Sequence, residues 1–106
     1  MKLNDYQISA ESTAIYPKEN SIIYPALGLT GEAGEVADKV KKILRDCETN
    51  LFYRDDIAKE LGDVLWYVAV LARDLGYSLE EVAQMNLDKL EDRKNRNMLQ
   101  GSGDDR

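Results

Sequence analysis

The sequence predicts an all-α fold with four helices, and three observations support that class. Signals for β-strands are nearly absent along its 106 residues. Two long segments carry apolar residues at alternating spacings of four and three, the pattern of a helix that packs along one face. The segment from Ser78 to Glu81 reads Ser-Leu-Glu-Glu, which is a capping box of the kind that opens a helix.

The first two helices are expected over residues 4–15 and about 21–46. Asn4 or Asp5 is the N-cap candidate of the first helix, whose apolar pattern is the less regular one. Pro25 falls in the first turn of the second helix, where its missing N–H costs little. The apolar stripe of the second helix consists of Leu29, Ala33, Val36, Val40, Ile43 and Leu44.

The third helix is expected over residues 55–75, after a loop at 47–54. Asp55 is its N-cap candidate, and Gly76 fits as its C-terminal stop. Its stripe consists of Ile57, Leu61, Val64, Val68, Leu71 and Leu75. Because both stripes have the same spacing, the second and third helices are expected to pack as antiparallel neighbours.

The fourth helix follows the capping box. Residues 1–97 are expected to form one domain, because a chain of this length supports a single core. Residues 98–106 include Gly-Ser-Gly-Asp-Asp, a composition typical of disorder. These last residues are therefore expected to be a disordered tail.

Composition limits the chemistry that is open to the chain. There is no His and a single Cys, Cys47, which excludes a Ser-His-Asp triad, a Cys-His pair and a cysteine–histidine zinc site. The 14 Lys and Arg against 20 Asp and Glu give a net charge of −6, so no nucleic-acid partner is expected. Any catalysis must come from carboxylates, Lys, Arg, Tyr or a hard metal ion held by oxygen.

No membrane partner is expected either. No stretch approaches the roughly 20 apolar residues of a membrane span. The chain turns polar directly after Met1 and lacks the apolar core of a signal peptide. A cytoplasmic location is therefore expected.

A pair of carboxylates occurs twice, at the same register of the two striped helices. At an offset of 28 residues Glu32 matches Glu60, and Glu35 matches Asp63. At about 100° per residue, each pair lies one turn apart on the same shoulder of its stripe. Antiparallel packing is therefore expected to bring all four acids together.

Four clustered carboxylates repel one another, and a divalent cation is the usual compensation. Oxygen ligands suit Mg²⁺, with Mn²⁺ as a substitute, and both ions bind substrate phosphates. Gly34 and Gly62 also match, and two helical glycines, each about 1 kcal/mol less favourable than Ala, suggest that backbone, an ion or a ligand comes close at these positions. The alternative is a solvated face, with Lys39 paired to Glu35, in a non-catalytic helical interaction module.

These motifs resemble the Glu-x-x-Glu…Glu-x-x-Asp signature of MazG-like nucleoside triphosphate pyrophosphohydrolases, which belong to the all-α NTP pyrophosphatase superfamily. The matching segments are Gly-Glu-Ala-Gly-Glu at 31–35 and Glu-Leu-Gly-Asp at 60–63, extended by 24–32 and 63–68. The resemblance covers about residues 4–96. It implies an oligomeric four-helix bundle of that superfamily's type.

The resemblance also implies an enzyme that hydrolyses a (deoxy)nucleoside triphosphate to the monophosphate and pyrophosphate. Glu32, Glu35, Glu60 and Asp63 would be both the catalytic residues and the ligands of Mg²⁺. Metal-activated water would attack the α-phosphate, and one of these acids or Asp56 would take its proton.

Phosphate contacts are expected from the fourth helix. Asn86, Lys89 and Arg93 follow one another at helical spacing; a solvated surface is the alternative, and the resemblance favours substrate binding. Tyr67 lies four residues after Asp63 and is expected to point toward the acids.

Gln7 and Tyr16 are the candidates for holding the base, with Glu11 and Tyr24 as further ones. A purine deoxynucleotide, dGTP or dATP, is favoured because two tyrosines can stack on a large base. A pyrimidine-specific dCTP or dUTP enzyme is the alternative. The related dCTP pyrophosphatases carry Trp and His where this chain has Tyr16 and Gln7, which weakens a cytosine preference.

Trp66 lies opposite the stripe of the third helix and is expected at a second packing surface or a subunit contact. Leu65 and Ala69 are apolar as well, so this helix has more apolar surface than a four-helix monomer can cover. A homo-oligomer is predicted, a dimer or a tetramer, with the tetramer favoured.

Overall fold

The structure is a computed structural model that describes residues 1–46 and 53–106. Within these residues it contains helices only, which confirms the all-α prediction. The elements in chain order are α1 (Leu3–Glu11), the 3₁₀ turn η1 (Lys18–Asn20), α2 (Ile23–Asp46), α3 (Tyr53–Asp74) and α4 (Leu79–Asn95).

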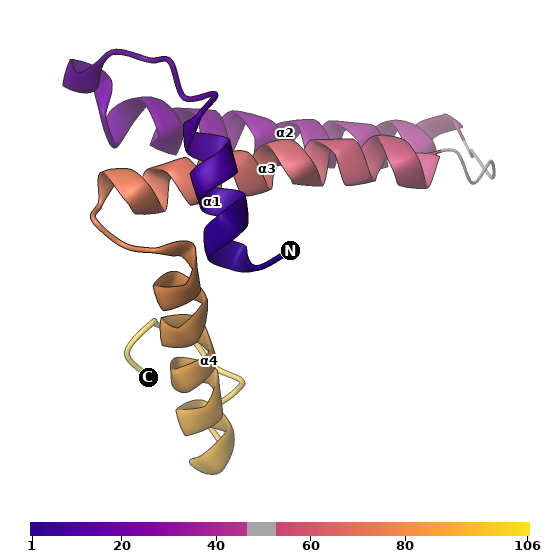
Figure 1. Ribbon diagram of the computed structural model, residues 1–106. Coiled ribbons are helices and arrows are strands. Elements are labelled where there is room, and N and C mark those ends of the chain that lie inside the picture. The colour runs from indigo at the N-terminus through magenta and orange to yellow at the C-terminus, as the bar shows by residue number, and fades with distance from the viewer. Residues whose placement is uncertain (47–52) are drawn as a thin grey trace.

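The two longest helices, α2 and α3, lie side by side as an antiparallel hairpin, as their stripes predict (Figure 1). The short α1 crosses α3, and α4 contacts α1 and α3 but points away from the hairpin. Within one chain the arrangement is therefore a hairpin with two flanking helices. A single chain does not close a four-helix bundle, because α4 does not run along α2, and the oligomeric bundle that was expected stays a prediction.

The first helix differs from its prediction at both ends. Its N-cap is Lys2, without a side-chain cap, so neither Asn4 nor Asp5 caps it. Asn4 instead accepts the Glu80 N–H at 3.0 Å and thereby caps α4. The helix ends at Glu11, four residues early.

The hydroxyls of two residues accompany this early end of α1. Ser12 donates to the Ser9 carbonyl at 2.6 Å, and Thr13 donates to the Ala10 carbonyl at 2.9 Å. Such local side-chain bonds to the backbone compete with helix continuation. The connection to α2 therefore begins at Ser12.

The predicted ends of the later helices are partly right. Pro25 lies in the first turn of α2 and is buried. The third helix begins at Tyr53, so Asp55 is not its N-cap. Asp55 lies inside the first turn, where its negative charge interacts favourably with the helix dipole. Of the predicted loop at 47–54, residues 47–52 lie outside the described residues.

The corner between α3 and α4 is built as predicted. Gly76 has φ +85°, a left-handed conformation that ends a helix without strain. The Ser78 hydroxyl accepts the Glu81 N–H at 3.1 Å, and the Glu81 carboxylate accepts the Ser78 N–H at 3.4 Å. This reciprocal pair is the predicted capping box.

The buried core lies where α1, α3 and α4 meet. It consists of Ala10, Ala69, Val70 and Leu79. The stripes of the hairpin are covered only on one side, and several of their members are exposed: Val40, Leu44, Leu61 and Leu75. Two helices alone cannot enclose a stripe, because each covers only the side of the other that faces it.

Residues 98–106 form bends and turns that fold back beside α4 (Figure 1). The disordered tail expected there stays a prediction. Among the described residues, no helix combines the length and the apolar character that crossing a membrane requires.

Candidate active site

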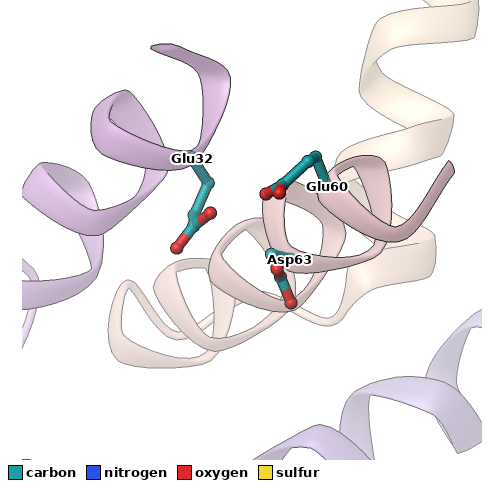
Figure 2. A group of neighbouring side chains, drawn as sticks. All are labelled: Glu32, Glu60 and Asp63. Atoms are coloured by element: carbon teal, nitrogen blue, oxygen red, sulfur yellow. The ribbon is translucent and has the colours of Figure 1, made fainter. Parts of the chain in front are cut away.

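Three carboxylates from the two hairpin helices converge near the middle of the hairpin. Glu32 extends from α2, and Glu60 and Asp63 extend from α3 (Figure 2). One oxygen from each side chain lies within 4.8 Å of the others. Glu32 and Glu60 are half-buried, whereas Asp63 is exposed. Hard cations of the Mg²⁺ type take ligand oxygens in such groups.

Glu35 is the exception among the four predicted acids. It is exposed, and its carboxylate is not one of the three that meet. Its charge still acts on Glu32, three residues earlier on the same helix, and contributes to that residue's raised pKa. The cluster therefore holds three of the four expected acids.

The electrostatics of the cluster are those of crowded negative charges. Burial, followed by the charges of Asp63 and Glu60, raises the pKa of Glu32 above its ordinary value. Lys39 Nζ lies 3.6 Å from Glu60 Oε1, so this cation pairs across the hairpin and not with Glu35, as the alternative of a solvated face would have it. One lysine balances only part of the charge of three carboxylates.

A hollow of about 340 Å³ opens beside the acids. Its lining residues are Thr13, Glu32, Asp63, Trp66 and Tyr67. The Trp66 Nε1–H donates to the Thr13 hydroxyl at 2.8 Å, which attaches the connection after α1 to α3. Trp66 thus forms the expected second packing surface, and its ring is one wall of the hollow.

Tyr67 borders the hollow and lies next to the acids, as predicted. Its ring packs on Gly28 so closely that a Cβ there would lie 2.2 Å from Tyr67 Cε1. No described heavy atom lies within 4 Å of a Cβ placed at Gly34 or Gly62, so within one chain no backbone comes close there; the approach of an ion or a ligand stays a prediction. The sequence carried a signal for Gly28, a helical glycine, but the choice among the glycines depends on the packing.

Tyr16 has a different environment from the one expected. Its hydroxyl donates to Asp74 at 2.6 Å and accepts from Arg73 at 2.9 Å. Burial, followed by the bond to Asp74, raises the pKa of Tyr16 to about 12. Its ring stacks on Tyr24 at a centroid distance of 4.8 Å, and Tyr24 lies 6.4 Å from Tyr67. Tyr16 is joined to the site through this row of rings and does not line the hollow.

Gln7 is buried, and its amide is fully occupied by the backbone. The Nε2 group donates to the carbonyls of Ala69 at 3.0 Å and Tyr77 at 3.1 Å. The Oε1 atom accepts the Leu79 N–H at 2.9 Å. Its polar atoms hold α1 to the corner between α3 and α4, and Gln7 does not line the hollow, so the base contact expected of it stays a prediction.

The predicted phosphate-binding residues of α4 lie away from the hollow in this chain. Asn86 is exposed, and neither it nor Lys89 nor Arg93 lines the hollow. Lys89 and Arg93 both bind Asp104, which the sequence analysis did not single out. No local signal marks Asp104, because the contact joins residues 11 and 15 positions apart.

The chain is similar to a known family and to a phage protein. The family model of the MazG nucleotide pyrophosphohydrolase domain matches residues 24–98 of this chain, and these residues contain all four predicted acids. The "Gene 37 protein" of Mycobacterium phage L5 is 51% identical over 114 aligned positions, which cover 100% of both chains. No solved structure matches the chain. On the match over residues 24–98, and with three acids brought together from α2 and α3, the chain belongs to the MazG nucleotide pyrophosphohydrolase family.

Proposed function

We propose that this chain is a Mg²⁺-dependent pyrophosphohydrolase that converts a deoxynucleoside triphosphate into the monophosphate and pyrophosphate. The observation that carries the proposal is the convergence of Glu32, Glu60 and Asp63 beside a hollow with aromatic walls. The acids suit a cation that binds phosphates, and the aromatic rings suit a base. The triphosphate and the base of a nucleotide can therefore both be bound at one place.

The donor set fits Mg²⁺. It is made of oxygen alone, and its negative charge exceeds the single positive charge of Lys39 nearby. Burial raises the pKa of Glu32 most, and the neighbouring carboxylates raise it further. Mn²⁺ takes the same ligands and is expected to substitute. Glu35, exposed one turn from Glu32, is proposed as a fourth ligand, which it becomes through a change of side-chain rotamer.

In the proposed reaction, a water oxygen forms a bond to the α-phosphorus while the bond from that phosphorus to the bridging oxygen breaks. Pyrophosphate leaves with the bridging oxygen. Bound Mg²⁺ supplies neutralisation of the triphosphate and a lowered pKa for coordinated water. The carboxylates hold the reacting groups in position, and one of them or Asp56 takes the proton of the water. Asp56 lines a second hollow together with Lys39, next to the cluster.

The base is proposed to be a purine, as in dGTP or dATP. Trp66 and Tyr67 lie edge to face at 4.9 Å, and Tyr24 lies behind Tyr67. A large base gains more stacking contact with such a surface than a small one. The alternative is a pyrimidine substrate, dCTP or dUTP. Turnover rates for all common nucleoside triphosphates distinguish the two, and turnover of pyrimidines alone overturns the purine proposal.

A homo-oligomer is proposed because the chain exposes apolar surface along the hairpin. Leu27, Leu44 and Leu61 are exposed by 70%, 76% and 53%. A second copy packed on these helices would cover that surface, complete a bundle, and add the Asn86, Lys89 and Arg93 face to a neighbouring site. A dimer or tetramer satisfies this proposal.

Product analysis tests the proposed activity. The purified protein is incubated with each dNTP and Mg²⁺, and the products are separated by ion chromatography. Monophosphate and pyrophosphate in equal amounts support the proposal. Diphosphate and phosphate would identify a phosphatase instead, and no turnover, together with no stoichiometric Mn²⁺ binding by calorimetry, would favour a non-catalytic helical module.

A further inference from the structure

Lys89 and Arg93 form an anion site on α4 that the chain itself occupies. Lys89 Nζ lies 2.7 Å from Asp104 Oδ1, and Arg93 Nη2 lies 3.5 Å from the same oxygen. Arg93 Nη2 also donates to the Asp104 carbonyl. One residue thus offers two oxygens to two cations that lie one helical turn apart.

Arg93 is a buried cation with an unused hydrogen-bond donor. Its side chain is 7% exposed although it carries a full charge. Its Nε–H is buried and has no hydrogen-bond partner among the described residues. A buried donor without a partner is uncommon, and a guanidinium binds oxyanions best through two parallel N–H groups. Asp104 therefore binds the Nη2 group of Arg93 and leaves its Nε–H donor unused.

The segment that carries Asp104 is held in its folded-back shape by Arg106. The Arg106 guanidinium donates to the carbonyls of Met98 at 3.3 Å, Leu99 at 2.9 Å and Gly103 at 2.7 Å. Gly103 has φ +90°, which places the turn just before Asp104. Asp104 itself is 77% exposed and Lys89 is 38% exposed, so the ion pair between them is of the exposed kind that contributes little stability and that another anion can displace.

We propose that Asp104 is an internal substitute for a phosphate group, which closes the Lys89–Arg93 site until a phosphate-bearing ligand displaces it. A phosphate has more acceptor oxygens than Asp104 presents, and one of them would supply the missing partner of Arg93 Nε–H. Residues 98–106 then act as a latch that competes with the polyphosphate of the substrate. This inference rests on the proposed function, because that function makes a triphosphate the ligand.

The test compares Asp104→Asn with the wild-type chain in binding of pyrophosphate, measured by calorimetry. Asp104→Asn is expected to bind pyrophosphate about two- to fivefold more tightly, the range expected when a competing exposed ion pair is removed. Asp105→Asn is the matched control, because it removes the same charge one residue later and its carboxylate makes no ion pair within the described residues. A gain in Asp104→Asn that exceeds the gain in Asp105→Asn supports the latch, and equal affinities in both overturn it.

Side-chain NMR locates the site. In ¹⁵N-labelled protein the Arg93 Nε–H signal, identified by its loss in Arg93→Lys, is expected to shift when pyrophosphate binds and to shift at lower concentration in Asp104→Asn. Inorganic phosphate is the second probe, and a weaker response to it indicates a site for a polyphosphate group. An unmoved Arg93 signal overturns the inference. Wild-type protein that hydrolyses no dNTP yet shows these shifts overturns the proposed function alone.

Discussion

The hydroxyl of Tyr16 donates a 2.6 Å hydrogen bond to Asp74 Oδ2, which joins the connection after α1 to the last residue of α3. The same oxygen accepts the Ile22 N–H at 3.0 Å. Ile22 has φ +71°, a left-handed conformation that a β-branched residue rarely adopts. Arg73 binds Asp74 Oδ1 at 2.9 Å. One carboxylate therefore fixes the middle and the end of the segment between α1 and α2.

Replacing this carboxylate is expected to destabilise the fold. Asp74→Asn removes the charged acceptor of Tyr16 and Ile22, and we expect the free energy of unfolding to fall by about 1–3 kcal/mol, as measured by chemical denaturation. Asp105→Asn, at an exposed position, is expected to stay within about 0.5 kcal/mol of the wild type. Equal stabilities of the two variants would contradict this role of Asp74.

The raised pKa of Tyr16 predicts an alkaline loss of stability. The pKa of Tyr16 is raised to about 12 in the folded chain against an ordinary value of 10.0, so the folded state holds this proton more tightly than the unfolded state. The stability contributed is fully present below pH 10 and is lost as the pH rises from 10 to 12. Denaturation of the wild type and of Tyr16→Phe across that range measures it. The prediction fails if both lose stability in parallel.

Gly28 and Gly31 provide a matched pair on α2. Gly28→Ala places a methyl group in the ring of Tyr67, and we expect a loss of about 1–3 kcal/mol in the free energy of unfolding, typical of overpacking. Gly31→Ala meets open space and is expected to stabilise the helix by about 1 kcal/mol. Thermal denaturation gives the signs. Because Tyr67 lines the hollow, Gly28→Ala is also expected to raise KM for the dNTP.

The metal site predicts an order among the acids. Glu60→Gln removes a member of the three-acid cluster, so Mn²⁺ affinity, measured by calorimetry, is expected to fall more than about tenfold, since even residues that only orient a ligand cost that much. Glu35→Gln is expected to cost less, because Glu35 lies outside the three that meet. An equal loss of Mn²⁺ affinity in both variants would mean that Glu35 binds the metal as strongly as Glu60 does.

The exposed apolar surface of the hairpin predicts self-association. Sedimentation of the wild type is expected to show a species of at least twice 12.0 kDa. Leu44→Lys adds a charge at a side chain that is 76% exposed and is expected to weaken association. Ser9→Lys adds the same charge at an exposed polar position of α1 and serves as the control. A stable 12.0 kDa wild type would end the oligomer proposal.

The parts of this structure that the sequence predicts are those that depend on neighbouring residues or on one pairing of helices. The capping box at Ser78, the stop at Gly76 and the register of Glu32 against Glu60 follow from local spacing and from antiparallel packing. Each signal lies within one helix or repeats at a fixed offset in two helices. Periodicity carries such information without knowledge of the rest of the fold.

The parts that sequence analysis missed depend on contacts between distant segments. Gln7 looked like a polar side chain open to a base, and it is buried against backbone groups 62 to 72 positions away. Lys39 could pair with Glu35 at the usual helical spacing, but it pairs with Glu60 on the other helix. In both cases the residue type is compatible with two environments; the packing of α1 on α3 decides between them for Gln7, and the packing of α2 on α3 decides for Lys39.

The contacts of Gln7 bear on the order in which the chain folds. The α2–α3 hairpin forms between helices that are neighbours in the sequence. Gln7 instead joins α1 to the corner between α3 and α4, 70 positions further along, and closing this longer loop has a larger entropic cost. The acceptors and donors that Gln7 needs exist only once α3 has ended and α4 has begun. We therefore expect α1 and α4 to dock as one cooperative unit on a hairpin that forms earlier.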